Sequence, residues 1–130
     1  MDLNLRLIHS RDYIKTTPEG ELDLAASKQL LLRLASENAA PCQYDILIDN
    51  RHTTGHLSLA DITELVRVMI EHRESFRSKL AILVRPEDTL ELAKFMELYA
   101  GNRGFRVAAF RDFEEAMNWL MTSSELTAGA

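Results

Sequence analysis

The stretch that decides the fold begins with Tyr44-Asp45-Ile46-Leu47-Ile48-Asp49, a short apolar run with a carboxylate near each end. Its three central residues are all apolar, so a strand here would carry apolar side chains on both of its faces. This is typical of an interior strand of a parallel sheet. The polar segment Asn50-Arg51-His52-Thr53-Thr54-Gly55-His56 follows. An amphipathic helix pattern then opens at Ser58. Open α/β sheets bind ligands and partners where their strands end. We therefore expect the function to lie at this strand-to-helix junction.

The helix pattern after the junction is regular. Ser58 and Asp61 resemble a capping box, with Asp in place of the usual Glu. The apolar residues that follow recur three and four positions apart, which is the spacing of one helix face. They are Ile62, Leu65, Val66, Met69 and Ile70. The pattern predicts a helix that runs to about Phe76.

Two strands and a helix are predicted before the junction. Alternating leucines at Leu3–Leu7 have the period of a half-buried strand, and Tyr13–Thr17 is a weaker strand pattern. The short link between them predicts an antiparallel hairpin. Pro18-Glu19-Gly20 predicts a turn or a bulge. A leucine-rich helix pattern then starts at about Asp23 and stops before Asn38.

Two further strands and two helices are predicted after the helix that begins at Ser58. Leu80–Val84 is apolar on both faces and predicts a second interior strand. Pro86-Glu87-Asp88 predicts a helix start, because acidic residues favour the positive end of the helix dipole. Gly101–Gly104 predicts the end of that helix. Phe105–Phe110 predicts the last strand, and Asp112 predicts the cap of a final helix.

The predicted order of elements is β-β-α-β-α-β-α-β-α. Strands that alternate with helices indicate a mostly parallel sheet with right-handed crossovers, and the hairpin makes the sheet mixed. We therefore expect an α/β fold with a five-stranded, mixed, mostly parallel sheet and four helices. A chain of 130 residues with 46% apolar content suits one domain. This domain would span residues 1–122, and the small polar residues of 123–130 predict a disordered tail.

Composition argues against several classes of protein. The net charge is -5, from 15 basic and 20 acidic residues, whereas a nucleic-acid binder normally has a basic surface. Cys42 is the only cysteine, so no intrachain disulfide can form, which fits a reducing compartment. The sequence has no signal-peptide pattern and no apolar stretch of membrane-spanning length. We expect a cytoplasmic protein without a nucleic-acid partner or a membrane span.

The polar junction contains residue types that catalytic and metal sites use. A nucleophile, a base and an orienting acid could come from Asp49, His52, Thr53, Thr54, His56 and Ser58. Such groups, however, meet in space rather than along the chain. His52 and His56 could bind a metal, but no third ligand stands at a useful spacing. In the alternative interpretation, the junction is a solvated loop and Ser58 accepts free N–H groups of the helix. We expect no catalytic residue, no metal site and no cofactor.

Three segments resemble the STAS domain, the fold of bacterial anti-sigma factor antagonists. Gly20-Glu21-Leu22-Asp23 is similar to the segment that ends the family's second strand and opens its first helix. Ile46-Leu47-Ile48-Asp49 resembles its third strand, which ends in Asp. Gly104–Leu120 resembles the end of these domains, and is closest to stand-alone STAS-like proteins. The resemblance covers nearly the whole chain and implies a STAS-like fold.

The resemblance also gives Ser58 a role. In the antagonists, a serine nine residues after the strand Asp is phosphorylated by a partner kinase, and counting from Asp49 reaches Ser58. A helix N-terminus there offers free N–H groups to a phosphate. The family pattern is Asp-Ser-Ser-Gly, whereas this chain has Leu57-Ser58-Leu59-Ala60. Ser58 is therefore either a phosphorylation site or a plain helix cap.

We consider three hypotheses of function. The first is a non-enzymatic, STAS-like regulatory or signalling module that binds a protein partner of unknown identity. Its contact residues would be Asp49, Asn50, Arg51, His52, Thr53, Thr54, His56 and Ser58. The second is a carrier of a small apolar ligand or lipid, with a pocket between the second and third helices. Its lining would include Met69, Phe76, Phe95, Met96 and Tyr99. The third is a hydrolase that uses the junction. An apolar patch would also allow a homodimer.

Overall fold

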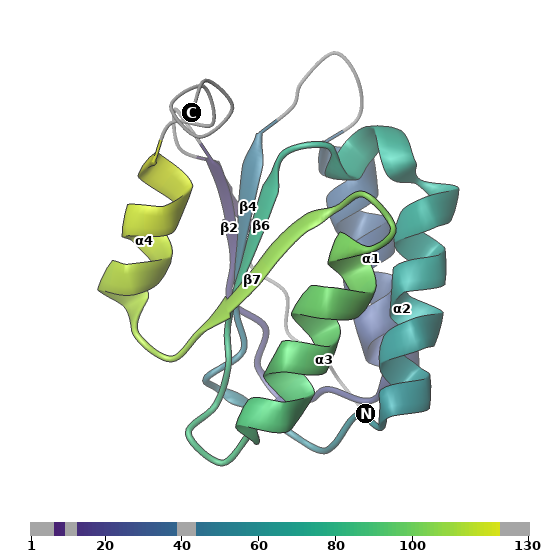
Figure 1. Cartoon of the computed structure of the whole chain (residues 1–130), viewed down its shortest axis with the longest axis vertical. Helices are drawn as coiled ribbons and strands as arrows, with labels where there is room; N and C mark the ends of the chain where they lie inside the picture. Colours follow the sequence, from purple (N-terminus) through teal and green to yellow (C-terminus); the bar gives the residue numbers. More distant parts are fainter. Residues whose placement is uncertain (1–6, 10–12, 39–43, 123–130) are drawn as a thin grey trace.

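Five strands form the main sheet of the computed structural model, in the order β1-β2-β4-β6-β7 (Figure 1). They are β1 (Leu7–His9), β2 (Tyr13–Thr16), β4 (Asp45–Asp49), β6 (Lys79–Leu83) and β7 (Arg106–Phe110). β1 runs antiparallel to β2, and the other neighbouring strands are parallel. The predicted mixed, mostly parallel sheet is confirmed, with the predicted hairpin at one edge.

The structure describes residues 7–9, 13–38 and 44–122. Part of the predicted first strand, Cys42 and the predicted tail at 123–130 lie outside the described residues.

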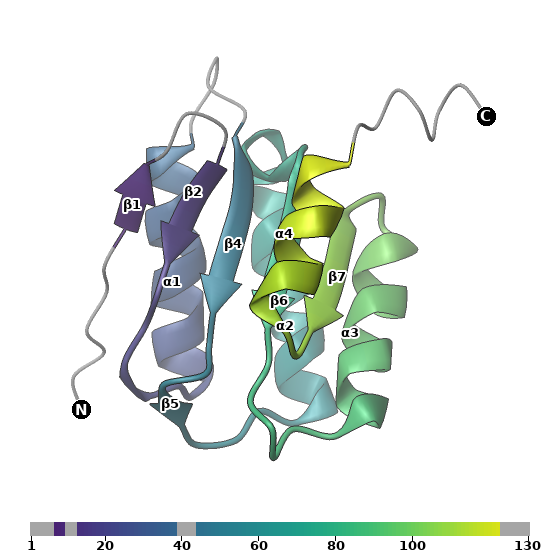
Figure 2. The same ribbon diagram turned by 90° about the vertical axis from the view of Figure 1, so that its left-hand side faces the viewer.

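Four α-helices of the described chain pack on the sheet in two unequal layers. They are α1 (Leu24–Glu37), α2 (Leu59–Glu71), α3 (Leu90–Gly101) and α4 (Phe113–Met121). α1, α2 and α3 cover one face, while α4 lies alone on the other face, in front of β6 and β7 (Figure 2). None of the helices in the described ranges is long and apolar enough to cross a membrane.

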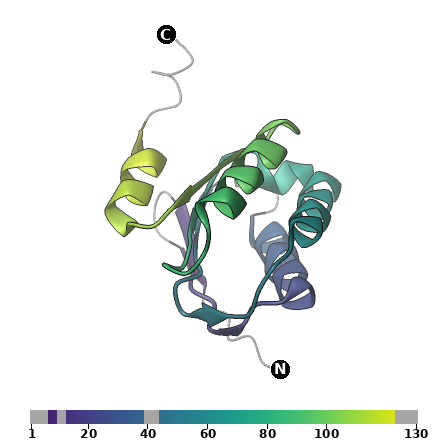
Figure 3. The same cartoon turned by 60° about the horizontal axis from the view of Figure 1, so that its bottom comes forward.

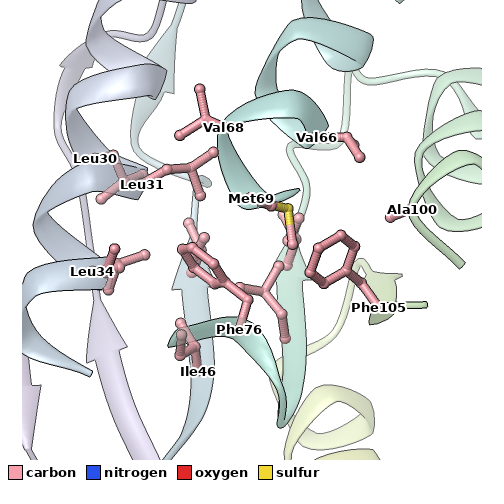
Figure 4. Packing of buried hydrophobic residues seen from close by; sticks show 14 of the residues in the cluster. Leu30, Leu31, Leu34, Ile46, Val66, Val68, Met69, Phe76, Ala100 and Phe105 are labelled. Atoms are coloured by element: carbon pink, nitrogen blue, oxygen red, sulfur yellow. The ribbon is translucent and has the colours of Figure 1, made fainter. Parts of the chain in front are cut away.

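The alternating direction of strand side chains explains the two layers. On one face, Ile46 and Ile48 pack with leucines of α1, with Met69 of α2 and with Phe76 (Figure 4). On the other face, Leu47 and its neighbours on β6 pack against Ala116 and Leu120 of α4. β4 is therefore buried from both sides, as an interior strand of a parallel sheet should be.

The second helix is shorter than its apolar pattern predicts. α2 ends at Glu71 and a 3-10 helix, η1 (Arg73–Phe76), follows. The prediction of one helix to Phe76 is therefore wrong. The chain turns here because Ser75 is pulled inward: its hydroxyl donates to the carbonyl of Ala35 (2.9 Å), and its carbonyl accepts from the amide of Asn38 (2.8 Å). These buried bonds leave Phe76 in the core.

The third helix begins later than predicted, because Pro86-Glu87-Asp88 forms a turn rather than a first helical turn. α3 starts at Leu90, and its cap is Thr89, whose hydroxyl accepts from the N–H of Leu92 (3.1 Å). The carboxylate of Asp88 instead accepts the N–H of Arg85 (2.9 Å), which closes the turn.

A second, two-stranded sheet was not anticipated. It pairs β3 (Gly20–Glu21) with β5 (Thr53–Thr54) in parallel. Pro18-Glu19-Gly20 therefore leads into a short strand, β3, that pairs with β5 in the segment after β4.

Candidate functional site

The candidate site lies at the carboxyl-terminal edge of the sheet. β4 and β6 end there, and α2 and α3 begin there, which Figure 3 brings forward. The segment from Asp49 to Ser58, which we call the junction loop, runs across this edge. It carries the eight contact residues that the sequence predicts.

Asp49 anchors the start of the junction loop from inside the protein. It is 2% exposed, and its carboxylate accepts the backbone N–H of Arg51 (3.1 Å) and two guanidinium N–H groups (2.9 Å each). Burial alone would raise the pKa of Asp49, but the hydrogen bonds and charge of Arg51 outweigh it and hold this pKa below its usual value. The same hydrogen bonds raise the pKa of Arg51. Asp49 is therefore an anchor, and the partly exposed Arg51 is the group that solvent reaches.

The middle of the junction loop is held by backbone pairing. The N–H and the hydroxyl of Thr53 both donate to the carbonyl of Asn50 (3.2 and 2.7 Å), and the N–H of Leu22 donates to the carbonyl of Thr54 (2.8 Å). Gly55 has φ +92°, and a Cβ there would lie 3.2 Å from the side chain of Glu21. Only glycine takes this conformation without strain so close to a neighbouring segment.

Arg85 braces the loop from the end of β6. This arginine is 8% exposed and directly follows the buried strand region. Its guanidinium donates to Asp88 (Nη2–Oδ1 2.9 Å) and to the carbonyl of Thr53 (Nη1–O 3.3 Å). Arg111, after β7, donates to the carbonyl of Asp88 (2.8 Å). One hydrogen-bonded chain thus links the segments that follow β4, β6 and β7.

The outer surface of the junction loop is polar. Its exposed residues are Arg51, His52, Thr54, His56 and Ser58. Thr53 and Asp49 are buried, and Asn50 is half-buried. Ser58 caps α2: its hydroxyl accepts the N–H of Asp61 (3.1 Å), whose carboxylate accepts the N–H of Ser58 (3.0 Å). The predicted capping box is confirmed.

The junction loop does not assemble a recognisable catalytic or metal centre. Within the described residues, no hydrogen bond connects His52 or His56 with Ser58 or Thr54. The described part of the chain also contains no group of three or more His, Cys, Asp or Glu side chains that could hold a metal ion. The hydrogen bonds around Ser58 are those of a helix cap.

Behind the loop lies a cavity of about 150 Å³ between the sheet and helices α1, α2 and α3. Most of its lining is aliphatic, including Leu30, Val66 and Ile82. Asn50, Thr53, Gly55, His56 and Leu57 of the junction loop line it as well, together with Arg85 and Asp88. The same loop therefore has an outer face toward solvent and an inner face toward the cavity.

Two residues of the cavity lining each have a buried polar side-chain atom without a hydrogen-bond partner. The hydroxyl of Ser27, on a residue 4% exposed, and Oδ1 of Asn50 make no hydrogen bond within the described structure. Thr16 also has an unpaired hydroxyl, but it is not part of this wall. Each of these atoms has less than 1 Å² of accessible surface, so both lie within the packing and do not face the open space of the cavity.

The side chains that the sequence suggested as pocket lining separate into two groups. Met69 and Met96 line the cavity. Phe95 and Tyr99 do not line it, but stack on each other with ring centroids 5.5 Å apart. Phe76 belongs to the core beside β4.

Sequence reasoning missed Arg85, Asp88 and Ser27. A signal existed for the first two, because a charged residue directly after a fully apolar strand, with an acid three positions on, suggests a closed turn. Ser27 gives no such signal, since a serine in the first turn of a helix is ordinary.

Comparisons with known proteins agree with this architecture. No protein-family model and no curated protein matches the chain. Among solved structures, an uncharacterised protein of the DUF3478 family from Shewanella loihica, with a SpoIIAA-like fold, superimposes with a TM-score of 0.61. It is 21% identical, and the match covers 91% of this chain and 93% of that one.

Two structures of SpoIIAA match as well. The anti-sigma factor antagonist SpoIIAA in its unphosphorylated form gives a TM-score of 0.57 at 15% identity, over 94% of this chain and all of that one. The Bacillus cell fate determinant SpoIIAA in its phosphorylated form gives a TM-score of 0.53 at 16% identity. This match covers 92% of this chain and 99% of that one. The chain therefore has the SpoIIAA-like fold of STAS domains, as the resemblance in its sequence implies.

Proposed function

We propose that the chain is a non-enzymatic regulatory module that binds a protein partner through the outer face of the junction loop and the start of α2. One observation carries the proposal. Arg51, His52 and His56 are exposed on a loop whose backbone is anchored by Asp49 and braced by Arg85. A fixed loop with exposed side chains loses little conformational entropy on binding, which favours recognition.

The fold supports a regulatory role. SpoIIAA, which shares it, is an anti-sigma factor antagonist. We extend to this chain only the general role of a cytoplasmic, bacterial signalling component that acts by protein contact.

Ser58 is the residue at which we propose regulation. SpoIIAA has a phosphorylated form, and Ser58 is exposed at the N-terminus of α2. A phosphate there would gain from the helix dipole but would lie beside the carboxylate of Asp61, and so would open the capping box. Phosphorylation would therefore change both the charge and the local shape of the contact surface.

The test is affinity capture from the native host with three forms of the full chain. We expect a partner that binds the wild type to be lost with the double variant His52→Glu, His56→Glu, because two acidic groups alter the proposed contact. His72→Glu is the matched control, since His72 is exposed at the other end of α2. A partner set that is identical in all three forms would contradict the proposal. Ser58→Asp, compared with Ser58→Ala, tests the phosphoswitch in the same assay.

Ligand binding is a second candidate function, and the cavity is the observation that favours it. Met69 and Met96 would contact the ligand, while Phe95 and Tyr99 would pack outside it. Native mass spectrometry of the purified chain would reveal a retained molecule.

A homodimer is also proposed, through exposed leucines such as Leu90 and Leu98 on α3. Sedimentation that shows only monomer at high concentration would exclude it.

A further inference from the structure

We propose that Glu97 guards the open edge of the main sheet, by keeping β7 from pairing with the β7 strand of a second copy of this chain. Glu97 lies on α3, and β7 is the last strand in the sheet order. This role goes beyond the proposed function, because neither Glu97 nor β7 belongs to the junction loop. It also differs from the proposed homodimer, which would use the exposed leucines of α3 rather than the edge of the sheet.

The backbone of β7 turns alternate residues toward the open side. The carbonyl of Phe110 accepts the N–H of Val84 (2.8 Å), so Phe110 directs its backbone groups toward the chain of β6, and Ala108 does the same. The N–H and C=O groups of Val107 and Ala109 therefore point the other way, to a side on which the described sheet has no further strand (Figure 2). Such an edge is a template for another strand.

Glu97 closes one of these positions. Its Oε2 accepts the N–H of Ala109 (2.7 Å), although the two residues are 12 positions apart in the chain. Glu97 is half-buried, and among the described residues its side chain has no other hydrogen bond and no ion pair. A carboxylate that accepts a backbone N–H makes a charge-assisted bond, about twice as strong as a bond between neutral groups. The N–H of Ala109 is therefore the group that holds this carboxylate at the edge.

A second strand would have to displace the carboxylate. The strand needs the N–H of Ala109 for one of its own carbonyls, and the charge of Glu97 would then lose its hydrogen bond beside a carbonyl oxygen. Two identical edges that pair about a two-fold axis meet this cost twice, because each copy contributes a Glu97. A charged residue that points inward at an edge is one of the ways in which proteins prevent such pairing.

Without Glu97 the edge would suit pairing. The stretch Val107-Ala108-Ala109-Phe110 contains no charged residue and no proline, which are features that usually protect an edge. Two copies in antiparallel orientation are self-complementary here, because each edge offers the same alternating N–H and C=O groups. Leu98, which directly follows Glu97, is 66% exposed and adds apolar surface on the same helix.

The test is sedimentation velocity of the full chain over a series of concentrations. We expect Glu97→Ala to form a dimer with a Kd about 100-fold lower than that of any wild-type dimer, because each of the two guards contributes about tenfold. Glu91→Ala is the matched control, since it removes the same charge from an exposed position of the same helix. This control should associate as the wild type does.

Amide hydrogen exchange locates the association. In the wild type, the N–H of Ala109 should be protected at every concentration, because Glu97 accepts it. In Glu97→Ala, this N–H should exchange about 10-fold faster at concentrations where the chain is monomeric. It should become protected again where the variant is dimeric, because the partner strand then accepts it.

Three results would overturn the guard role. If wild type, Glu91→Ala and Glu97→Ala associate equally, Glu97 has no effect on the edge. If both variants associate more strongly by the same factor, net charge governs association. If the N–H of Ala109 exchanges as fast in the Glu97→Ala dimer as in the monomer, the contact lies elsewhere. A wild type that stays monomeric contradicts the homodimer through the leucines of α3 but agrees with the guard role.

Discussion

Asp49 carries a buried charge whose partner is two residues away in the chain. Replacing it by Asn keeps the shape but removes the charge-assisted bonds to Arg51, so we expect Asp49→Asn to lower the free energy of unfolding by about 1–3 kcal/mol at pH 7. The pKa of Asp49 is lowered in the fold, so its contribution is present above the unfolded value of about 3.9 and is lost as pH falls through the folded pKa.

Urea unfolding at several pH values measures this effect. The difference between wild type and Asp49→Asn should be largest near neutral pH and should shrink below about pH 4. Glu64→Gln is the control, because the pair of Glu64 with Arg67 lies on the surface of α2 and such pairs contribute little. A constant difference down to the lowest pH would show that Asp49 is not charged in the folded protein.

Single residues were the hardest level to predict from the sequence. The capping box of Ser58 and Asp61 is local, so its spacing in the sequence was sufficient. The brace of Arg85 on Thr53 joins residues 32 positions apart, and depends on the order of β4 and β6 in the sheet. Sequence patterns record neighbours along a helix or strand and not such contacts, which explains why the brace was missed.

α4 is held against the sheet by an unusual contact at its end. Lys79, on β6, is 8% exposed, and its ammonium donates to the carbonyl of Trp119 (2.8 Å) and to that of Thr122. These are carbonyls of the last helical turn, where a positive charge also favours the helix dipole. Trp119 is the only tryptophan, so its fluorescence reports directly on this helix end.

Lys79→Met keeps most of the aliphatic stem but removes the charge. We expect it to cost about 1–2 kcal/mol of stability and to shift Trp119 emission to longer wavelength, because the last turn of α4 loosens. Lys94→Met, at an exposed position on α3, is the control. Wild-type stability and emission in Lys79→Met would contradict the capping role.

Elements were predicted well where their apolar pattern was strong. β4 and β6 were recognised because burial on both faces selects continuous apolar residues. The errors lie at helix ends, where buried polar contacts compete with the helix. Ser75 turns the chain after α2, and Asp88 closes a turn before α3.

At the scale of the whole molecule, the order of elements predicted the architecture, because right-handed crossovers leave few arrangements of these strands. What this order could not predict is that the junction loop is clamped from several sides: by β3, by Arg85 after β6 and, through Asp88, by Arg111 after β7. We infer that these contacts fix the position of the loop, with a contact surface on its outer side and a cavity on its inner side.

Amide hydrogen exchange of the junction loop measures whether these contacts hold it in place. The N–H groups of Leu22 and Thr53 should exchange about 100-fold or more slowly than in an unfolded chain, because both are bonded within the clamp. Arg85→Met should accelerate the exchange of both. The backbone N–H of Asn38, which is bonded to Leu34 beside the start of β4, should stay protected, and Arg67→Met should change none of them. If the N–H groups of Leu22 and Thr53 exchange at unfolded-chain rates in the wild type, the loop is not held in place by these contacts.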